Sequence, residues 1–179
     1  MCGIAGFINR EVDAPQTERE NLLDRMCKVI THRGPDEQGT IVEGRAALGM
    51  RRLSIIDLKT GDQPVWNESR TVIAVMNGEI YNFQSLKKDL EKKGHKFQTE
   101  TDTEVVPHLY EEYGEDFVEH LNGMFAIALW DIRLNKLIIA RDRFGEKPLY
   151  YGVFGKKLYF ASELKVLLTH SEIDPEIDL

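Results

Sequence analysis

Cys2 is the residue whose type and position most directly suggest covalent chemistry. Its small side chain at the second position predicts removal of Met1, which leaves a thiol and a free α-amino group on one residue. At neutral pH only about 3% of an ordinary thiol is thiolate, whereas roughly 10–15% of an α-amino group is unprotonated. The amine can therefore act as the base for the thiol in acyl transfer. Position alone favours the structural alternative, a buried cysteine at the start of a strand.

Asn77 and Gly78 follow an apolar stretch and are the next candidates for chemistry. A glycine N–H beside an asparagine amide supplies two uncharged donors, which is what an oxyanion hole requires. The alternative is that Asn-Gly is only a turn dipeptide, and for these two residues taken alone this alternative is favoured.

Charged residues near apolar stretches are candidates for binding a substrate. Arg51 or Arg52 could hold a carboxylate through a bidentate contact, and the alternative is a surface ion pair with Asp57 or Asp62, which we expect more of Arg51. Asp102 could bind an ammonium group or cap a helix. Two further sequence features are expected to be structural: Cys27, which shares a helical face with apolar residues, and the charged turn 141–145.

These residues must be positioned by strands and helices that the sequence also predicts. Apolar runs predict strands at 2–8, 46–50, 72–76, 124–130, 136–140, 149–154 and 157–161. Helices are expected from the capping box of Thr17 and Glu20, at 83–93 between Asn82 and Gly94, at 103–113 before Gly114, and after Ser162. Residues 31–40 are expected to be a loop. This pattern predicts an α+β layered domain, with sheets packed on each other and helices outside.

Composition excludes several classes of protein. The chain has 179 residues, a net charge of −7 and two cysteines, which predicts one domain without disulfides, in a reducing cytoplasmic compartment. The acidic charge argues against nucleic acid as a partner, and the lack of a long apolar run argues against a membrane span. The five histidines lack metal-ligand spacing, and the chain has no phosphate loop and no dinucleotide fingerprint. We therefore expect neither a metal nor a cofactor.

Several ordered motifs together resemble the glutaminase domain of class II glutamine amidotransferases, which are N-terminal nucleophile hydrolases. The resemblance is closest to the N-terminal half of glutamine-hydrolysing asparagine synthetases, and it covers Cys2 to about Leu168. The matching segments are 2–6 (CGIAG), 32–36 (HRGPD), 52–57 (RLSIID), 61–64 (GDQP), 77–82 (NGEIYN), 102–105 (DTEV), 121–126 (LNGMFA) and 140–151 (ARDRFGEKPLYY).

The resemblance implies a four-layer αββα fold and a set of site residues. It implies that Cys2 attacks the side-chain amide of L-glutamine to form a glutamyl thioester, which water hydrolyses after ammonia departs. Asn77 and the Gly78 N–H would hold the oxyanion. Substrate binding is implied for Arg52 at the α-carboxylate, for Glu79 and Asp102 at the α-ammonium, and for the backbone of Leu53, Ile55 and Ile56.

The resemblance also implies a domain arrangement. Residues 2–170 would be the glutaminase domain, and 171–179 would begin a linker towards a synthetase domain in the same polypeptide. That second domain would use ATP and Mg²⁺ to convert aspartate to asparagine with the ammonia, and its pyrophosphate loop is not in this sequence. A homodimer is left open.

Two alternatives remain. The chain could be the glutaminase domain of another class II amidotransferase, such as those that make phosphoribosylamine or glucosamine 6-phosphate. It could also be a non-catalytic regulatory module, which would follow if Met1 were retained, because the amine would then lie up to ~3.6 Å of chain away from Cys2.

Overall fold

The computed structural model describes residues 2–10, 14–53 and 61–170. Nine strands form two antiparallel sheets in this part of the chain. The first sheet has the strand order β2-β3-β1-β9-β8 and the second has the order β4-β5-β6-β7. Strands of the first sheet are β1 (Gly3–Asn9), β2 (Glu37–Glu43), β3 (Ala46–Arg52), β8 (Tyr150–Phe154) and β9 (Lys157–Ala161). Strands of the second sheet are β4 (Val65–Trp66), β5 (Val72–Ile80), β6 (Gly123–Asp131) and β7 (Lys136–Arg141).

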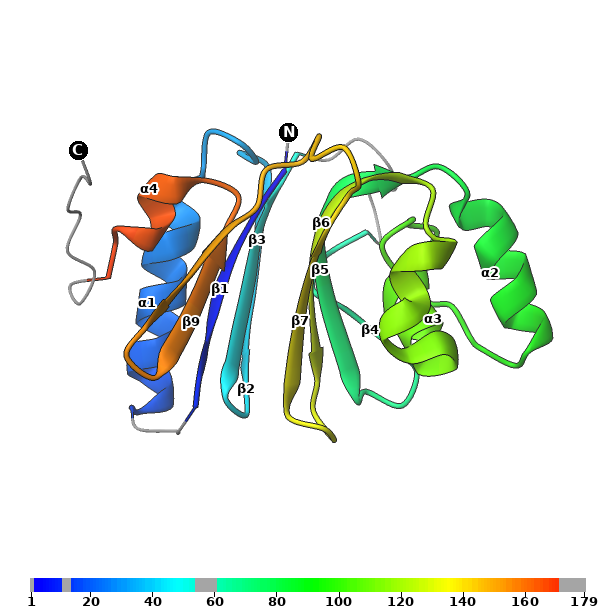
Figure 1. Cartoon of the computed structure of the whole chain (residues 1–179), viewed down its shortest axis with the longest axis horizontal. Helices are drawn as coiled ribbons and strands as arrows, with labels where there is room; N and C mark the ends of the chain where they lie inside the picture. The colour runs from blue at the N-terminus through cyan, green and yellow to red at the C-terminus, as the bar shows by residue number, and fades with distance from the viewer. Residues whose placement is uncertain (1, 11–13, 54–60, 171–179) are drawn as a thin grey trace.

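The sheets stack face to face, and helices cover both outer faces (Figure 1). The helices are α1 (Gln16–Val29) and α4 (Leu164–Leu167) on the first sheet, and α2 (Phe83–Lys92) and α3 (Val105–Tyr113) on the side of the second, followed by the 3₁₀ helix η1 (Gly114–His120). The predicted α+β fold with αββα layers is therefore confirmed.

Alternation along the strands divides the core into three apolar layers. In β5, Val72, Ala74 and Met76 pack with α3 in one cluster, whereas Ile73 and Val75 lie in the cluster between the sheets. The third cluster joins α1 to the first sheet. Cys27 belongs to it and is fully buried, which raises the pKa of its thiol to about 12 and confirms its core role.

Several element boundaries differ from the sequence prediction. The expected loop 31–40 contains the start of β2, whose polar, half-exposed residues give no apolar alternation although they pair with β3. α1 begins at Gln16 after Pro15 and makes no side-chain cap hydrogen bond, so the capping box of Thr17 and Glu20 was wrong. Asn82 occupies the N-cap position of α2, but its side-chain Oδ1 accepts from the Asn122 N–H instead of capping the helix.

Glycines end the helices where the sequence predicts. After α2, Gly94 has φ +104°, its N–H donates to the Glu91 carbonyl, and the His95 N–H donates to the Leu90 carbonyl. This pair of bonds is a Schellman motif, which needs a residue in the left-handed region. Gly114 likewise ends α3, at φ +58°.

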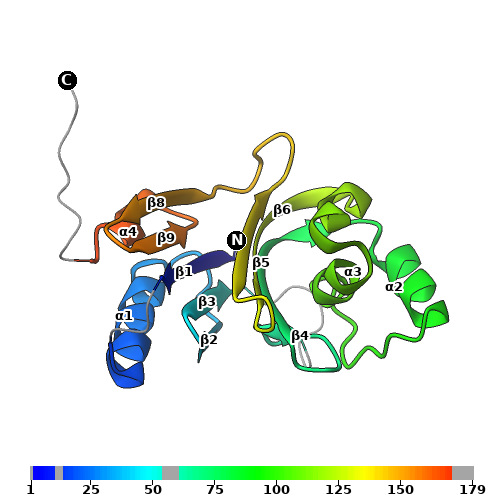
Figure 2. The same ribbon diagram turned by 60° about the horizontal axis from the view of Figure 1, so that its bottom comes forward.

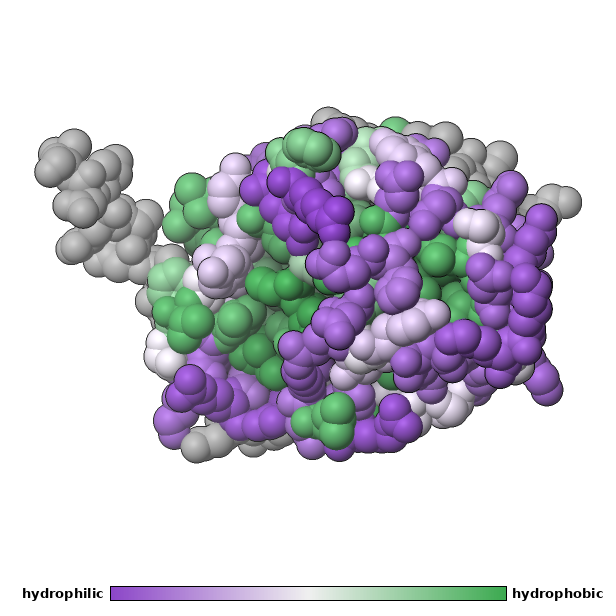
Figure 3. Space-filling view, turned by 45° about the vertical axis from the view of Figure 1, so that its right-hand side comes forward, coloured by the Kyte–Doolittle hydropathy of each residue, from purple (hydrophilic) through white to green (hydrophobic). Residues whose placement is uncertain are grey.

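One face of the molecule carries an apolar hollow between hydrophilic regions (Figure 3). β7 and β8, the last strands of the two sheets, both have half-buried or exposed side chains. Among the described residues, no helix has both the length and the apolar composition needed to span a bilayer.

Candidate active site

A cleft lies at the end of the sandwich where β1 begins and β5 ends. Its lining includes six of the predicted site residues: Cys2, Arg52, Leu53, Gly78, Glu79 and Asp102. The Cys2 side chain is half-buried, and its Sγ lies 3.4 Å from the Leu53 nitrogen and 3.7 Å from the Leu53 oxygen. The Leu53 N–H donates to the sulfur, which stabilises negative charge there.

The backbone of Cys2 is held in place by Arg33, which pairs with Glu163. Neither residue has a role predicted from the sequence. Arg33 donates from Nε to the Cys2 carbonyl at 2.9 Å, and its Nη1 pairs with Glu163 at 3.2 Å. Glu163 also accepts from His32 at 2.7 Å and from Lys165 at 3.0 Å. Burial opposes ionisation of Glu163, but these hydrogen bonds outweigh it and lower its pKa to about 2.

Strand alternation also directs the Asn77 side chain towards the Cys2 side of the sandwich. Cys2 and Ile4 pack in the cluster between the sheets, as do Ile73 and Val75, and Asn77 continues that face of β5. Asn77 is 1% exposed, and its Nδ2 has no hydrogen-bond partner among the described residues. A buried amide donor without a partner costs about 1–3 kcal/mol, so an acceptor brought by a ligand would relieve this cost.

The Gly78 N–H lies on an edge of β5 that side chains, rather than a strand, complete. Ladder alternation places the N–H groups of Met76, Gly78 and Ile80 on the edge away from β6. The first donates to Gln63 Oε1 at 2.7 Å and the last to Asp102 Oδ2 at 2.8 Å. In the described part of the chain, no side chain takes the Gly78 N–H between them, and Gly78 lines the cleft.

Glycine is required at position 78 by packing as well. A Cβ there would lie 2.3 Å from the Met124 carbonyl oxygen and 2.7 Å from the Phe125 Cα, and both are backbone atoms. Asn77-Gly78 is therefore no turn: both residues lie within β5, paired with β6.

Arg52 is buried beside the cleft and already carries opposite charges. Its Nη1 lies 2.8 Å from Glu37 and 3.4 Å from Asp62. The ion pair with Asp62 was expected of Arg51, which instead donates to the Gly34 and Pro35 carbonyls and to Gln38. The ion pair between Arg52 and Glu37 follows from the register of β2 against β3, which places these two residues directly opposite each other. Asp57 lies outside the described residues.

Glu79 and Asp102 bring two carboxylates to the cleft. Asp102 is 6% exposed, and burial raises its pKa; the Ile80 N–H opposes that rise and the nearby charge of Glu79 adds to it. The expectation that Asp102 caps α3 is wrong, because the helix begins at Val105 and the carboxylate accepts from Ile80. A cationic group between these carboxylates would offset both the burial and the repulsion.

The remaining predicted residues and some missed ones complete the site. Ile55 and Ile56 lie outside the described residues, and Asn77 lies behind the cleft surface rather than on it. Further lining residues without a predicted role are Gly61, Gln63, Met76, Thr101 and Thr103.

Gln63 binds both the N–H and the carbonyl of Met76 and also Thr103. A glutamine in a polar turn gave no signal for this, because its partners are distant in sequence.

The turn 141–145 is structural, as predicted. The Asp142 carboxylate accepts four backbone N–H groups, those of Phe125, Phe144, Glu146 and Lys147. Burial opposes ionisation of Asp142, but these four bonds outweigh it and lower its pKa.

Comparisons with known proteins agree with this geometry. The model of one protein family, described as glutamine amidotransferase domain, matches residues 1–179. The glutamine-hydrolysing asparagine synthetases 2 and 1 of Bacillus subtilis are 45% and 43% identical to the chain over 95% and 99% of its length. A rice asparagine synthetase is 44% identical over 93% of the chain. The chain spans only 22% to 29% of the length of these curated relatives.

Solved structures share the fold. A glutamine phosphoribosylpyrophosphate amidotransferase from Bacillus subtilis aligns with a TM-score of 0.76 and 22% identity, over 94% of this chain and 43% of that one. A structure described as the allosteric regulatory enzyme of purine biosynthesis aligns with a TM-score of 0.79 and 23% identity, over the same shares of the two chains.

Proposed function

The chain belongs to the family of glutamine amidotransferase domains, and from this membership we propose that its cleft hydrolyses L-glutamine to glutamate and ammonia, with Cys2 as the nucleophile. The observation that carries the proposal is a pair of donors that no described side chain takes: the Gly78 N–H, which lies at the same cleft as Cys2, and the buried Asn77 amide next to it in β5. Two such donors stabilise the oxyanion of a tetrahedral intermediate.

The chemistry uses groups of this chain and water. The Cys2 sulfur attacks the side-chain amide carbon, and the carbonyl oxygen becomes an oxyanion held by Asn77 and Gly78. The α-amino group of Cys2 takes the thiol proton and delivers it to the leaving nitrogen, so ammonia departs and a thioester remains. Water then attacks the thioester carbon, and the same two donors hold the oxyanion that forms. Collapse of this intermediate releases glutamate and restores the thiol. This requires Met1 to be removed, and the intact mass of the purified protein tests that step.

The cleft offers a positive charge for the α-carboxylate of glutamine and negative charges for its α-ammonium. Arg52 would bind the α-carboxylate, since its guanidinium is held in place by Glu37. Glu79 and Asp102 would bind the α-ammonium, which relieves their mutual repulsion. The Leu53 backbone lies against Cys2, near the bond that reacts. The roles of Ile55 and Ile56 stay predictions.

We further propose that the ammonia serves a synthetase domain that amidates aspartate with ATP and Mg²⁺. The support is that the relatives are named asparagine synthetases and extend well beyond the matched length. The alternative of another class II amidotransferase has only fold-level support, from neighbours under 25% identical. A non-catalytic module would not need the two unused donors.

Asn77→Ala tests the oxyanion assignment. Loss of one donor should lower turnover by on the order of 10²–10³, with KM for glutamine little changed. The measurement is steady-state glutamate release by the purified chain. A loss smaller than tenfold would contradict the role of Asn77.

A further inference from the structure

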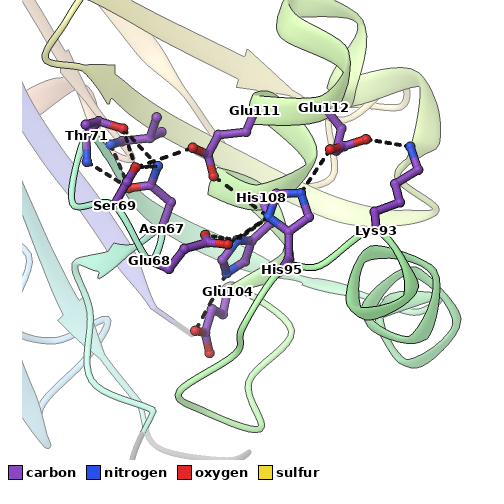
Figure 4. Close-up of polar contacts among 11 residues, drawn as sticks. Asn67, Glu68, Ser69, Thr71, Lys93, His95, Glu104, His108, Glu111 and Glu112 are labelled. Atoms are coloured by element: carbon purple, nitrogen blue, oxygen red, sulfur yellow. Dashed lines mark hydrogen bonds and ion pairs between the residues drawn. The ribbon is translucent and has the colours of Figure 1, made fainter.

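A second cluster of titratable side chains lies outside the cleft, where three segments meet (Figure 4). Glu68 comes from the turn between β4 and β5, His95 follows α2, and His108 and Glu111 lie one turn apart on α3. One ligand atom from each of these four residues lies within 4.8 Å of all the others. His108 is fully buried and the His95 side chain is 10% exposed, whereas the Glu68 side chain is 32% exposed, so the cluster extends from the core to the surface.

The distances between the four side chains, 3.0 to 3.9 Å, lie on either side of the edge length of a metal-ligand tetrahedron. His95 and His108 face each other with their Nδ1 atoms 3.2 Å apart. The Glu68 carboxylate bridges them, with Oε2 3.0 Å from His108 Nδ1 and Oε1 3.2 Å from His95 Nδ1. Glu111 Oε2 lies 3.9 Å from His95 Nδ1. Ligands at Zn–N and Zn–O bond lengths form a tetrahedron with edges of about 3.3–3.6 Å.

Ion pairing alone does not account for this arrangement. If both imidazoles carried a proton on Nδ1 to donate to Glu68, the two N–H groups would point at each other across 3.2 Å. If only one did, the other Nδ1 would present a lone pair to the carboxylate. Glu111 Oε2 is also buried, and it has no hydrogen-bond partner among the described residues. A cation at the centre would use all of these lone pairs.

The outer nitrogens of both imidazoles point to carboxylates, as metal-bound histidines commonly do. His95 Nε2 lies 3.1 Å from Glu112, which Lys93 also contacts at 2.6 Å. His108 Nε2 lies 3.8 Å from Glu104, a buried carboxylate that also accepts from the Gln98 and Thr99 N–H groups. His95 Nε2 is within hydrogen-bond distance of Glu112, whereas His108 Nε2 makes no hydrogen bond among the described residues. With the proton on Nε2 of each ring, each Nδ1 keeps its lone pair for the centre.

We propose that Glu68, His95, His108 and Glu111 bind one Zn²⁺ ion in a structural site. Two imidazole nitrogens and two carboxylate oxygens suit zinc, and the two carboxylates neutralise its charge. Four protein ligands close the coordination sphere, which is typical of a structural rather than a catalytic site. The site joins the β4–β5 turn, the segment after α2, and α3. Buried Asn67 stiffens that turn, since its Oδ1 accepts from the Thr71 and Val72 N–H groups.

This site could not be predicted from the sequence, because the spacing of 68, 95, 108 and 111 is not that of a zinc motif. Only the pair at 108 and 111 is local, and the fold supplies the other two ligands. The expectation of no metal considered only ligands that lie close together in sequence.

The test is Zn²⁺ binding by the purified chain after removal of metal with a chelator. Cys2→Ala is the background, because a terminal aminothiol is itself a zinc ligand. We expect one Zn²⁺ per chain by calorimetry and elemental analysis, and a higher melting temperature with Zn²⁺ than with chelator. Co²⁺ in place of Zn²⁺ should give the intense visible bands of a tetrahedral site. Absence of stoichiometric binding by this folded protein would overturn the proposal.

Variants locate the bound ion. His95→Gln and Glu111→Gln should each weaken Zn²⁺ affinity by more than about 100-fold, and Glu112→Gln by about 10–100-fold. His120→Gln is the matched control, since it removes a histidine that stacks on Tyr113 outside the cluster, and it should bind normally. Equal affinity in His95→Gln and His120→Gln would overturn the assignment. A ligand variant that fails to fold is replaced by Glu112→Gln, whose affinity must fall below that of the control.

Discussion

At the scale of single residues, the site depends on groups whose hydrogen bonds are made only in part before substrate binds. Asn77 and Gly78 each hold a donor in place beside Cys2, and the neighbouring N–H groups of β5 are taken by Gln63 and Asp102. Such preorganised donors need no rearrangement when charge develops on the substrate. The position of the Cys2 sulfur depends on a contact to the Cys2 backbone, where Arg33 donates to the carbonyl oxygen.

Arg33 is predicted to position the Cys2 backbone. Arg33→Met removes the hydrogen bond to the Cys2 carbonyl and the ion pair with Glu163. Because misplacement of a reacting group by about 1 Å can cost 10²-fold, we expect kcat to fall at least tenfold with little change in KM. The control is Lys165→Met, which also removes a partner of Glu163 but does not touch Cys2. Equal kcat in the Arg33→Met protein and the control would refute this role.

The Asp102 carboxylate is predicted to strengthen glutamine binding while lowering the stability of the folded protein. Its raised pKa means that the folded state binds the proton more tightly than the unfolded one, so stability falls as pH rises through that interval. Asp102→Asn removes the buried charge, and its Oδ1 can still accept from Ile80. At neutral pH we expect a melting temperature equal to or above wild type, with KM for glutamine at least tenfold higher.

Thermal melts and steady-state kinetics on the same preparation check the prediction for Asp102. In wild type, KM should also rise as pH falls and Asp102 becomes protonated. A clear drop in melting temperature together with an unchanged KM would show that the carboxylate is structural instead.

At the scale of elements, the sequence predicted what local patterns determine. Apolar runs located seven of the nine described strands in part or in full, and only β2 and the two-residue β4 were missed. β2 is a polar edge strand, so no alternation marked it. The predicted N-caps of α2 and α3 failed because Asn82 and Asp102 bond to distant backbone groups that no local pattern reveals. The predicted capping box of α1 failed because that helix begins earlier, at Gln16.

The candidate site also divides into features that local motifs predict and features that depend on long-range contacts. The motifs predicted Cys2, Gly78 and Asp102 as site residues, and the structure places all three at one cleft. The open Gly78 N–H, the role of Gln63 and the support from Arg33 depend on sheet register and long-range contacts. These could not be predicted from one sequence.

The turn after β7 offers a stability test at this scale. Asp142→Ala leaves one buried and three partly buried backbone N–H groups without their acceptor, so we expect a loss of about 3 kcal/mol in the free energy of unfolding. Because the Asp142 pKa is lowered, its contribution is present above the unfolded pKa and is lost as pH falls. Chemical denaturation measures the change, and Asp89→Ala on the exposed side of α2 is the control. Equal midpoints for the two variants would contradict the prediction.

At the scale of the whole molecule, stacking of the two sheets creates the site. Cys2 lies directly before β1, and Asn77 and Gly78 lie in β5. The two strands belong to different sheets that contact each other across the inner core. Charged groups complete the cleft: Arg52 at the end of β3, Glu79 at the end of β5 itself, and Asp102 before α3. The fold therefore assembles a charged, polar cleft at one end of an otherwise apolar sandwich.

The most direct test of the central claim is glutamine hydrolysis by the purified chain, with removal of Met1 verified by intact mass. We predict that the mature protein releases glutamate and ammonia from L-glutamine in equal amounts, and that Cys2→Ala releases neither above background. Circular dichroism should show the same fold for both proteins. Undiminished release by a folded Cys2→Ala protein would contradict the account.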